Sequence, residues 1–219
     1  MDLKQAMTER HTVRAYTERA LSPDVVQQVT ECVQRANAAH DVAIELVRDD
    51  ATAFNRVLRL VLAKGVRYYL ILAGDEAPDV RERLGWAGAE LMLRCQALGL
   101  NTWWVGGTFS HARVRDRVPG KQVIGIIAVG YGATQGKPHA SKRFEDVAEY
   151  EGAIPSWFRD GVRAALLAPT ALNRQAFKIS GSGRAVRISY EPGTFSGEDL
   201  GIVKYHFALG AGEGNFRWE

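Results

Sequence analysis

The stretch LLAPTALNRQAF (Leu166–Phe177) places a polar cluster directly after a run of small and apolar residues typical of a helix end. Pro169 predicts that the helix stops here, because a proline disfavours the helical conformation of the residue before it. Thr170, Asn173 and Gln175 then offer hydrogen-bond donors and acceptors on an irregular segment. Such a segment suits a ring with alternating N–H and C=O edges better than a metal ion or a nucleophile. A capped turn without a ligand is the alternative.

The residues around this stretch predict a second structural region. Residues 157–168 have the apolar spacing of a helix, and residues 175–192 read as two strands joined around GSG. A closing helix is predicted to begin at Asp199. Residues 145–156 are interpreted as a connector, because Pro155 interrupts regular structure.

The first 150 residues predict a sheet with helices around it. Ser22 is expected to cap a helix that has Pro23 at its first position. The alternation of elements favours an α+β fold, a central sheet flanked by helices. The expected strands cover residues 41–49, 66–74, 101–109 and 122–132, and the expected helices cover an N-terminal segment and residues 22–39, 51–65, 75–100 and 110–119.

The composition is that of an ordinary globular protein, with 46% hydrophobic and 24% charged residues among 219. A net charge of +3 is too small to argue for nucleic acid or a membrane surface. Cys32 and Cys95 form no CxxC pair, so we expect buried, reduced thiols and no metal site. The N-terminus lacks the apolar core of a signal peptide and no apolar run reaches about 18 residues, so a cytoplasmic location is expected.

Three further segments carry residues suited to ligand binding. In an extended RHTVRAY segment, Arg10, Thr12 and Arg14 point to one side and form a cradle for a phosphate monoester; a solvated basic stretch is the alternative. SKRF contributes Lys142 and Arg143 after a buried strand, or is an ordinary basic loop. The pair Gly106 and Gly107 allows a flat group to approach the backbone, or forms a tight turn. Trp86, Trp103 and Trp104 are candidates for aromatic walls, although core packing is the more ordinary role.

The chain contains a weak internal echo. Val29–Leu46 aligns without gaps on Val162–Ile179, and both segments read as helix, turn and strand. Any two such units resemble each other, which is the simpler explanation. The polar cluster has no counterpart in the first segment, where Ala36 stands opposite Pro169 and His40 opposite Asn173.

These segments, taken in order, resemble the nitroreductase family of FMN-binding oxidoreductases. RHTVRAY is similar to the family's Arg-x-Ser-x-Arg motif with Thr12 for Ser, and APTALNRQAF is similar to its Ala-Pro-Ser-x-x-Asn-x-Gln-Pro-Trp motif. In ordinary members the second motif follows soon after the first, and two chains form an intertwined dimer. Here it comes after residue 150, which resembles the putative nitroreductase subfamily in which one chain mimics that dimer.

The resemblance implies a nitroreductase-like central sheet, mostly antiparallel and flanked by helices, in a pseudo-dimer within one chain. Residues 1–150 would form the core, and residues 151–219 would supply the second half of one FMN site in a single integrated unit. Only one copy of each motif is present, so one FMN per chain is expected. The implied cofactor-binding residues are Arg10, Thr12, Arg14, Gly106, Gly107, Lys142, Arg143, Pro169, Thr170, Ala171 and Asn173.

The implied activity is ping-pong hydride transfer from NAD(P)H through FMN to a nitroaromatic, quinone or similar small acceptor. No catalytic side chain is assigned, because the cofactor carries the reactivity. The alternatives are a flavin-binding protein without turnover, such as a sensor or storage module, and a related FMN enzyme such as a dehalogenase or a flavin-fragmenting enzyme. A small-molecule partner, no nucleic acid, no membrane and a monomeric pseudo-dimer are expected, and further dimerisation is left open.

Overall fold

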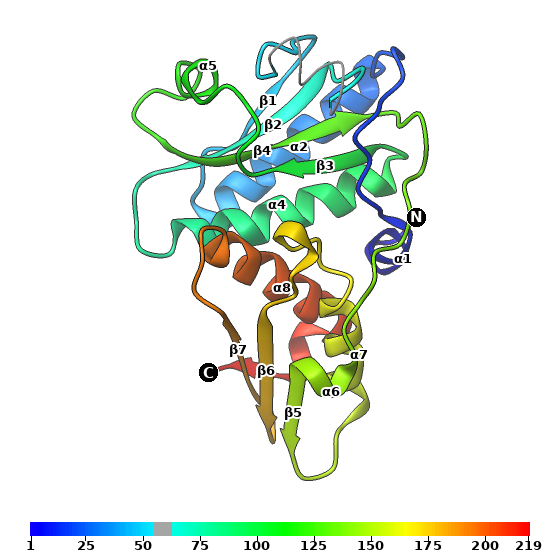
Figure 1. The fold of residues 1–219 in the computed structure, drawn as a ribbon, viewed down its shortest axis with the longest axis vertical. Helices are drawn as coiled ribbons and strands as arrows, with labels where there is room; N and C mark the ends of the chain where they lie inside the picture. Colours follow the sequence, from blue (N-terminus) through cyan, green and yellow to red (C-terminus); the bar gives the residue numbers. More distant parts are fainter. Residues whose placement is uncertain (55–62) are drawn as a thin grey trace.

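The computed structural model describes residues 1–54 and 63–219, which form two four-stranded sheets at opposite ends of the molecule with helices between them (Figure 1). The first sheet is antiparallel throughout, in the order β1-β2-β4-β3. Its centre is an apolar run in β2 whose residues are all buried. This arrangement confirms the predicted α+β class with a mostly antiparallel sheet flanked by helices. The strands are β1 (Glu45–Val47), β2 (Tyr68–Gly74), β3 (Asn101–Val105) and β4 (Gln122–Gly130).

The helix predicted over residues 22–39 is confirmed within one residue at each end, whereas the helices predicted over residues 75–100 and 110–119 are shorter in the structure. Ser22 accepts a hydrogen bond from the backbone N–H of Val25 and caps α2 (Pro23–His40). The long helix α4 (Val80–Ala97) ends just before Gly99, whose φ of +78° suits glycine. Short helices α1 (Leu3–Glu9) and α5 (His111–Arg115) complete this part. The helix expected over residues 51–65 falls mostly outside the described residues.

The second sheet is mixed, in the order β5-β6-β7-β8. Strands β6 and β7 form the predicted antiparallel hairpin, while β5 pairs with β6, and β8 with β7, in parallel. The strands are β5 (Ala148–Glu151), β6 (Phe177–Ser182), β7 (Ala185–Tyr190) and β8 (Arg217–Trp218).

Two sequence interpretations of this region are wrong. The supposed connector 145–156 contains the end of α6 (Phe144–Val147) and all of β5, because pairing with the distant β6 stabilises a short strand that alternates between half-buried and exposed residues. The closing helix α8 (Ser196–Ala211) begins three residues before the predicted Asp199, which lies in its first turn.

Helices α4 and α8 cross each other between the two sheets (Figure 1). Glycines allow the close approach: a Cβ atom on Gly85 would lie 2.2 Å from the backbone oxygen of Glu198, and one on Gly201 would lie 2.0 Å from that of Glu82. The apolar cluster below α4 also includes α7 (Ser156–Ala165), so the second part packs directly on the first. The order α7-β6-β7-α8 repeats that of α2-β1-β2-α4, and the pseudo-dimer itself stays a prediction.

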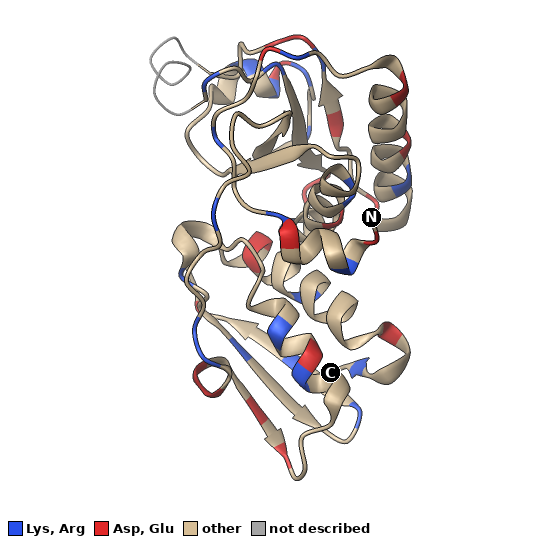
Figure 2. Ribbon diagram, turned by 90° about the vertical axis from the view of Figure 1, so that its right-hand side faces the viewer, with Lys and Arg blue, Asp and Glu red and all other residues tan. Residues whose placement is uncertain are grey.

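An extended segment links α1 to the edge of the first sheet. Thr12 forms a parallel bridge with Thr102 of β3, and Tyr16 an antiparallel bridge with Gly132. Basic and acidic residues are mixed along the ribbon rather than gathered in one region, in keeping with the small net charge (Figure 2). Among the described helices, none combines the length and apolarity needed to cross a membrane.

Candidate functional site

A cavity of about 790 Å³ lies where the N-terminal extended segment, the end of β3 and the loop after α7 meet. Its volume is typical of a small-molecule site, for which about 300–1,000 Å³ is usual. Residues more than 150 positions apart in the sequence share this lining. Eight of the eleven site residues expected from the sequence line it: Thr12, Arg14, Gly106, Gly107, Pro169, Thr170, Ala171 and Asn173.

Lys142 and Arg143 do not line the cavity. The ammonium group of Lys142 donates to the backbone oxygen of Gln175 at 2.9 Å, so this side chain holds the loop after α7 from behind. Arg143 is exposed and pairs with Asp146 at 3.0 Å at the start of α6. Both side chains have protein partners here, and their role in binding a cofactor stays a prediction.

Arg10 is also absent from the cavity lining, but its environment differs from that of the other two cations. The residue is only 4% exposed, and its Nε and Nη1 atoms have no hydrogen-bond partner within the described part of the chain. Burial lowers the pKa of its guanidinium to about 10, which leaves it protonated at neutral pH. A buried, charged donor without a partner is unfavourable unless an anion joins it.

Two cationic side chains, Arg14 and Lys137, line the cavity together with His11 and His139. The guanidinium of Arg14 lies 5.4 Å from the centre of the Trp103 ring, which fixes its direction. His139 donates through Nε2 to the backbone oxygen of Leu166 at 3.0 Å. Lys142 and Arg143 of the same loop were predicted instead, because composition does not show which residues of a loop face a cavity.

The loop after α7 forms one wall of the cavity. It contains a short 3-10 turn, Ala171–Asn173, and its residues Leu172, Asn173 and Gln175 have φ values of 53°, 54° and 46°. Such left-handed conformations are unfavourable for residues other than glycine and often mark functional sites. Leu172 is 93% exposed while it borders the cavity, so an apolar side chain stands at the opening.

Hydrogen bonds hold this strained loop in place. The amide of Asn173 donates to the backbone oxygen of Ala140 at 2.8 Å, and its oxygen accepts from Gln175 Nε2 at 3.0 Å. The backbone N–H of Gln175 donates to the hydroxyl of Thr170 at 3.1 Å. Part of the predicted polar cluster thus serves the loop itself.

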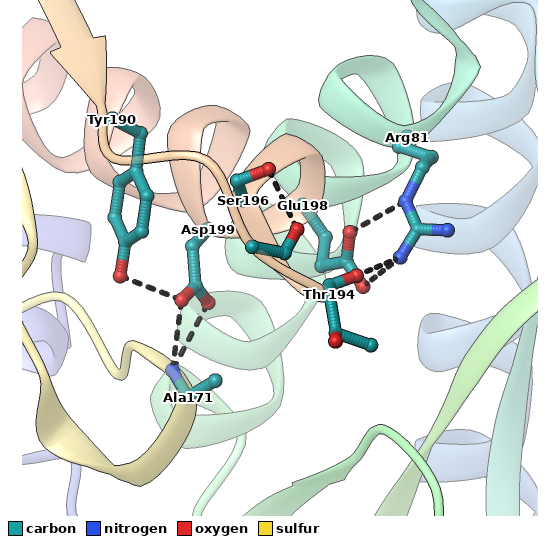
Figure 3. Close-up of polar contacts among 8 residues, drawn as sticks. Arg81, Ala171, Tyr190, Thr194, Ser196, Glu198 and Asp199 are labelled. Atoms are coloured by element: carbon teal, nitrogen blue, oxygen red, sulfur yellow. Dashed lines mark hydrogen bonds and ion pairs between the residues drawn. The ribbon is translucent and has the colours of Figure 1, made fainter.

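Two carboxylates from the first turn of α8, Glu198 and Asp199, also line the cavity, and Figure 3 shows their polar contacts. Both oxygens of Asp199 accept the backbone N–H of Ala171 at 3.0 Å, and Oδ2 also accepts the hydroxyl of Tyr190 at 2.7 Å. Glu198 pairs with Arg81 of α4 through two contacts of 2.8 Å. Burial raises the pKa of Asp199 to about 6, against the opposing effect of the Tyr190 hydrogen bond. Sequence reasoning placed Asp199 only at a helix start, because its partner Ala171 is distant in the chain.

Aromatic side chains form further parts of the lining. Trp103 and Trp104 border the cavity, so they serve as walls, whereas Trp86 packs against the apolar cluster. Phe195 leaves no room for a side chain at Gly106, where a Cβ atom would lie 2.7 Å from its ring. The cavity therefore combines a basic end, flat apolar walls and a polar loop. Such a lining suits an elongated ligand with an anionic group and a planar ring.

The described residues hold no group of three or more side chains arranged to bind a metal ion. His206, the one histidine of α8, is buried, and it donates through Nδ1 to the backbone oxygen of Ile202 at 2.8 Å. Burial lowers its pKa to about 3, so it is neutral at physiological pH.

Residues 2–211 match the family model described as "Putative TM nitroreductase". A search of curated proteins found no match.

Solved structures support the same fold. A putative nitroreductase from Thermotoga maritima shares 22% identity and a TM-score of 0.68, over 97% of this chain and 85% of that chain. A putative nitroreductase in complex with FMN from Desulfovibrio desulfuricans shares 20% identity and a TM-score of 0.56, over 71% and 99%. A putative NAD(P)H:FMN oxidoreductase from Staphylococcus epidermidis shares 16% identity and a TM-score of 0.54, over 68% and 95%.

Proposed function

The chain belongs to the putative TM nitroreductase family, and on this premise we propose that it is an oxidoreductase that uses bound FMN. The observation that carries the proposal is the single cavity bordered both by the N-terminal Thr12 and Arg14 and by the Pro169–Asn173 loop. Both halves of the sequence pattern meet there, as the resemblance requires. A similar fold in a structure that holds FMN adds support.

The residues present fit this cofactor. A ligand that carries a phosphate matches the cations Arg14 and Lys137 in the cavity lining. The unpaired buried donors of Arg10 lie in the same N-terminal segment, and an anion nearby would relieve their cost. Thr170 and Asn173 would face the edge of the ring, and the tryptophans its apolar part.

When bound, FMN would accept a hydride from NAD(P)H and pass it to a nitroaromatic, a quinone or a similar small acceptor. The side chains of this protein would bind and orient the two reactants in turn. Trp103, Trp104 and Phe195 would exclude water from the flat part of the cavity. Leu172 at the opening would contact an apolar acceptor. Hydride donor and acceptor would share one space, so ping-pong kinetics are expected.

We further propose one FMN per chain, held by a monomer. The proposal is supported by the two motif segments, Thr12–Arg14 and Pro169–Asn173, which border the same cavity within one chain. A small-molecule acceptor as the sole partner and a cytoplasmic location belong to the same proposal.

Steady-state oxidation of NADH and NADPH by FMN-loaded protein tests the activity. Parallel lines in double-reciprocal plots are expected with both a nitroaromatic and a quinone acceptor, and no turnover by FMN-free protein. A second experiment mixes the FMN-loaded protein with NADH or NADPH without oxygen and asks whether the flavin is reduced. A flavin that stays oxidised with both would contradict the oxidoreductase proposal and leave a flavin-binding protein without turnover.

A further inference from the structure

A buried carboxylate joins the last helix to the loop that lines the cavity. Asp199 is only 3% exposed and lies in the first turn of α8. Its two oxygens accept the same N–H group, that of Ala171, at 3.0 Å each, and Tyr190 of β7 donates to Oδ2 at 2.7 Å (Figure 3). Ala171 belongs to the cavity lining, so this contact fixes the backbone of the loop at the point where it faces a ligand.

The loop needs such a contact because its own conformation is unfavourable. Leu172 and Asn173, directly after Ala171, both have positive φ values. This conformation is unfavourable for residues other than glycine and persists only where the surrounding structure imposes it. Hydrogen bonds from Asn173 and Gln175 hold the far side of the loop to Ala140. Asp199 is the side chain that holds the near side.

The choice of a carboxylate at this position is itself informative. A neutral acceptor such as Asn could also receive the N–H of Ala171, yet the chain buries a group whose charge is disfavoured there. Hydrogen bonds to an ionised acceptor are roughly twice as strong as neutral ones. Groups that lower stability near a binding site are commonly retained for function.

We propose that Asp199 is a positioning residue of the flavin site: its carboxylate fixes the Ala171–Asn173 turn, and protonation of that carboxylate weakens the hold of the loop on FMN. The inference rests on the proposed function. In the ionised state Asp199 accepts hydrogen bonds from two donors that both point at it. After protonation one oxygen carries a hydrogen, so Tyr190 must turn to accept it and the N–H of Ala171 is left with a neutral acceptor.

The charges around Asp199 set the pH at which its carboxylate becomes protonated. Glu198 on the same helix opposes ionisation of Asp199, and Arg81 of α4 is the partner of Glu198. The hydroxyl of Tyr190, the backbone N–H of Ala171 and Arg174 of the loop favour ionisation. Because burial outweighs these three, the pKa of Asp199 is raised to about 6, and the carboxylate titrates close to neutral pH.

The test measures FMN affinity of the apoprotein by quenching of flavin fluorescence between about pH 5 and pH 8. A phosphate monoester also titrates at about pH 6, so the wild type is always compared with a variant. We expect FMN affinity to fall between pH 8 and pH values below 6. This fall should be about three- to tenfold larger in the wild type than in Asp199→Asn. Riboflavin, which lacks the phosphate, should show the same difference between the two proteins.

Two variants move the midpoint of this difference in opposite directions. Tyr190→Phe removes a hydrogen bond to the carboxylate, so the midpoint shifts to higher pH. Glu198→Gln removes a repulsive charge, so the midpoint shifts to lower pH. A general loss of packing would not produce shifts of opposite sign, and these variants also serve if Asp199→Asn does not fold.

The backbone amide of Ala171 supplies a readout that needs no cofactor. Its proton resonance should titrate with the Asp199 carboxyl in wild type and stay flat in Asp199→Asn. Identical FMN affinity profiles for wild type and Asp199→Asn, or a flat Ala171 resonance in wild type, would overturn the positioning role and leave the proposed function intact. Failure of FMN to bind the wild type at any pH would reject both.

Discussion

Val29–Leu46 and Val162–Ile179 align as helix, turn and strand, yet the structure treats their turns differently. In the first segment α2 continues to His40, and a short turn leads into β1. In the second, α7 stops at Ala165, and eleven residues separate it from β6. This stretch has three left-handed residues, against one, Asp41, in the first turn, and its residues Pro169–Asn173 line the cavity. The same local plan therefore yields a plain connection in one half and a binding loop in the other.

The difference shows what a binding loop requires beyond its own sequence. Pro169 prevents the longer helix, but the shape of the loop depends on contacts from distant elements. Asp199 of α8 holds one side, while Lys142 and Ala140 hold the other. The first segment has Asn37 bonded to Ile44 across its turn, a local contact that needs no outside support.

The largest expected effect comes from separating the two halves. Gly201→Ala places a Cβ atom 2.0 Å from the backbone oxygen of Glu82, so α4 and α8 must move apart. We expect a loss of about 3 kcal/mol in the free energy of unfolding, although alanine in an open helix position would gain about 1 kcal/mol over glycine. Urea denaturation measures the change. Gly214→Ala, with open space around it, is the control and should stay within about 0.5 kcal/mol; equal stability of both variants would refute the close crossing.

Replacement of Arg10 tests the N-terminal side of the site. Arg10→Met keeps the buried volume and removes the unpaired charge. We expect FMN binding to weaken by about 1–3 kcal/mol, while the cofactor-free protein becomes more stable by about 1 kcal/mol or more. Calorimetric titration with FMN and urea denaturation of the apoprotein measure the two terms. Unchanged FMN affinity would remove Arg10 from the site.

The pH dependence of the free energy of unfolding tests the role of Asp199, which contacts the binding loop of the second half. Its folded pKa, about 6, lies above the ordinary value of 3.8, so its stabilising contribution is complete below about pH 4 and is lost as the pH rises through 6. Asp199→Asn should abolish this slope and be the more stable protein at pH 8, by about 1–3 kcal/mol. Urea denaturation midpoints of the wild type and Asp199→Asn, measured from about pH 4 to pH 8, test this prediction. A wild type that gains stability relative to Asp199→Asn as the pH rises would reverse the sign and contradict the assignment.

A reciprocal exchange between the two turns has the smallest expected effect. Asn173→His gives the loop the residue of the first segment, loses the hydrogen bond to Ala140 and places a less suitable residue at a φ of 54°. FMN affinity should fall by about 1 kcal/mol. The counterpart His40→Asn should leave FMN affinity unchanged, since α2 lies outside the cavity. An equal effect of the two exchanges on FMN binding would mean that the loop has no special role.

Much of the fold follows from local signals in the sequence. Ser22 and Pro23 mark the start of α2, and the apolar run of β2 marks a central strand. The strand β5 escaped prediction because its sequence, AEYE, is half acidic and its stability comes from pairing with β6.

The site was predictable to the extent that its motifs are contiguous. The extended segment and the Pro169–Asn173 loop were found from the sequence, and they do meet. Asp199 and Lys137 were missed, because an acidic residue at a helix start and a lysine in a loop are ordinary until the fold brings them to the cavity. The contact of Lys142 with the loop at Gln175 was likewise not foreseen from the sequence, because it joins two distant segments.

The most direct measurement is the number of flavins that one chain holds. Apoprotein titrated with FMN, followed by removal of free cofactor, should give a yellow protein with one FMN per chain, and sedimentation should show a monomer. That result would establish that the N-terminal extended segment and the Pro169–Asn173 loop build a single site between them. A colourless protein would contradict the account, and so would two flavins per chain, which would require the first turn to bind a cofactor as well.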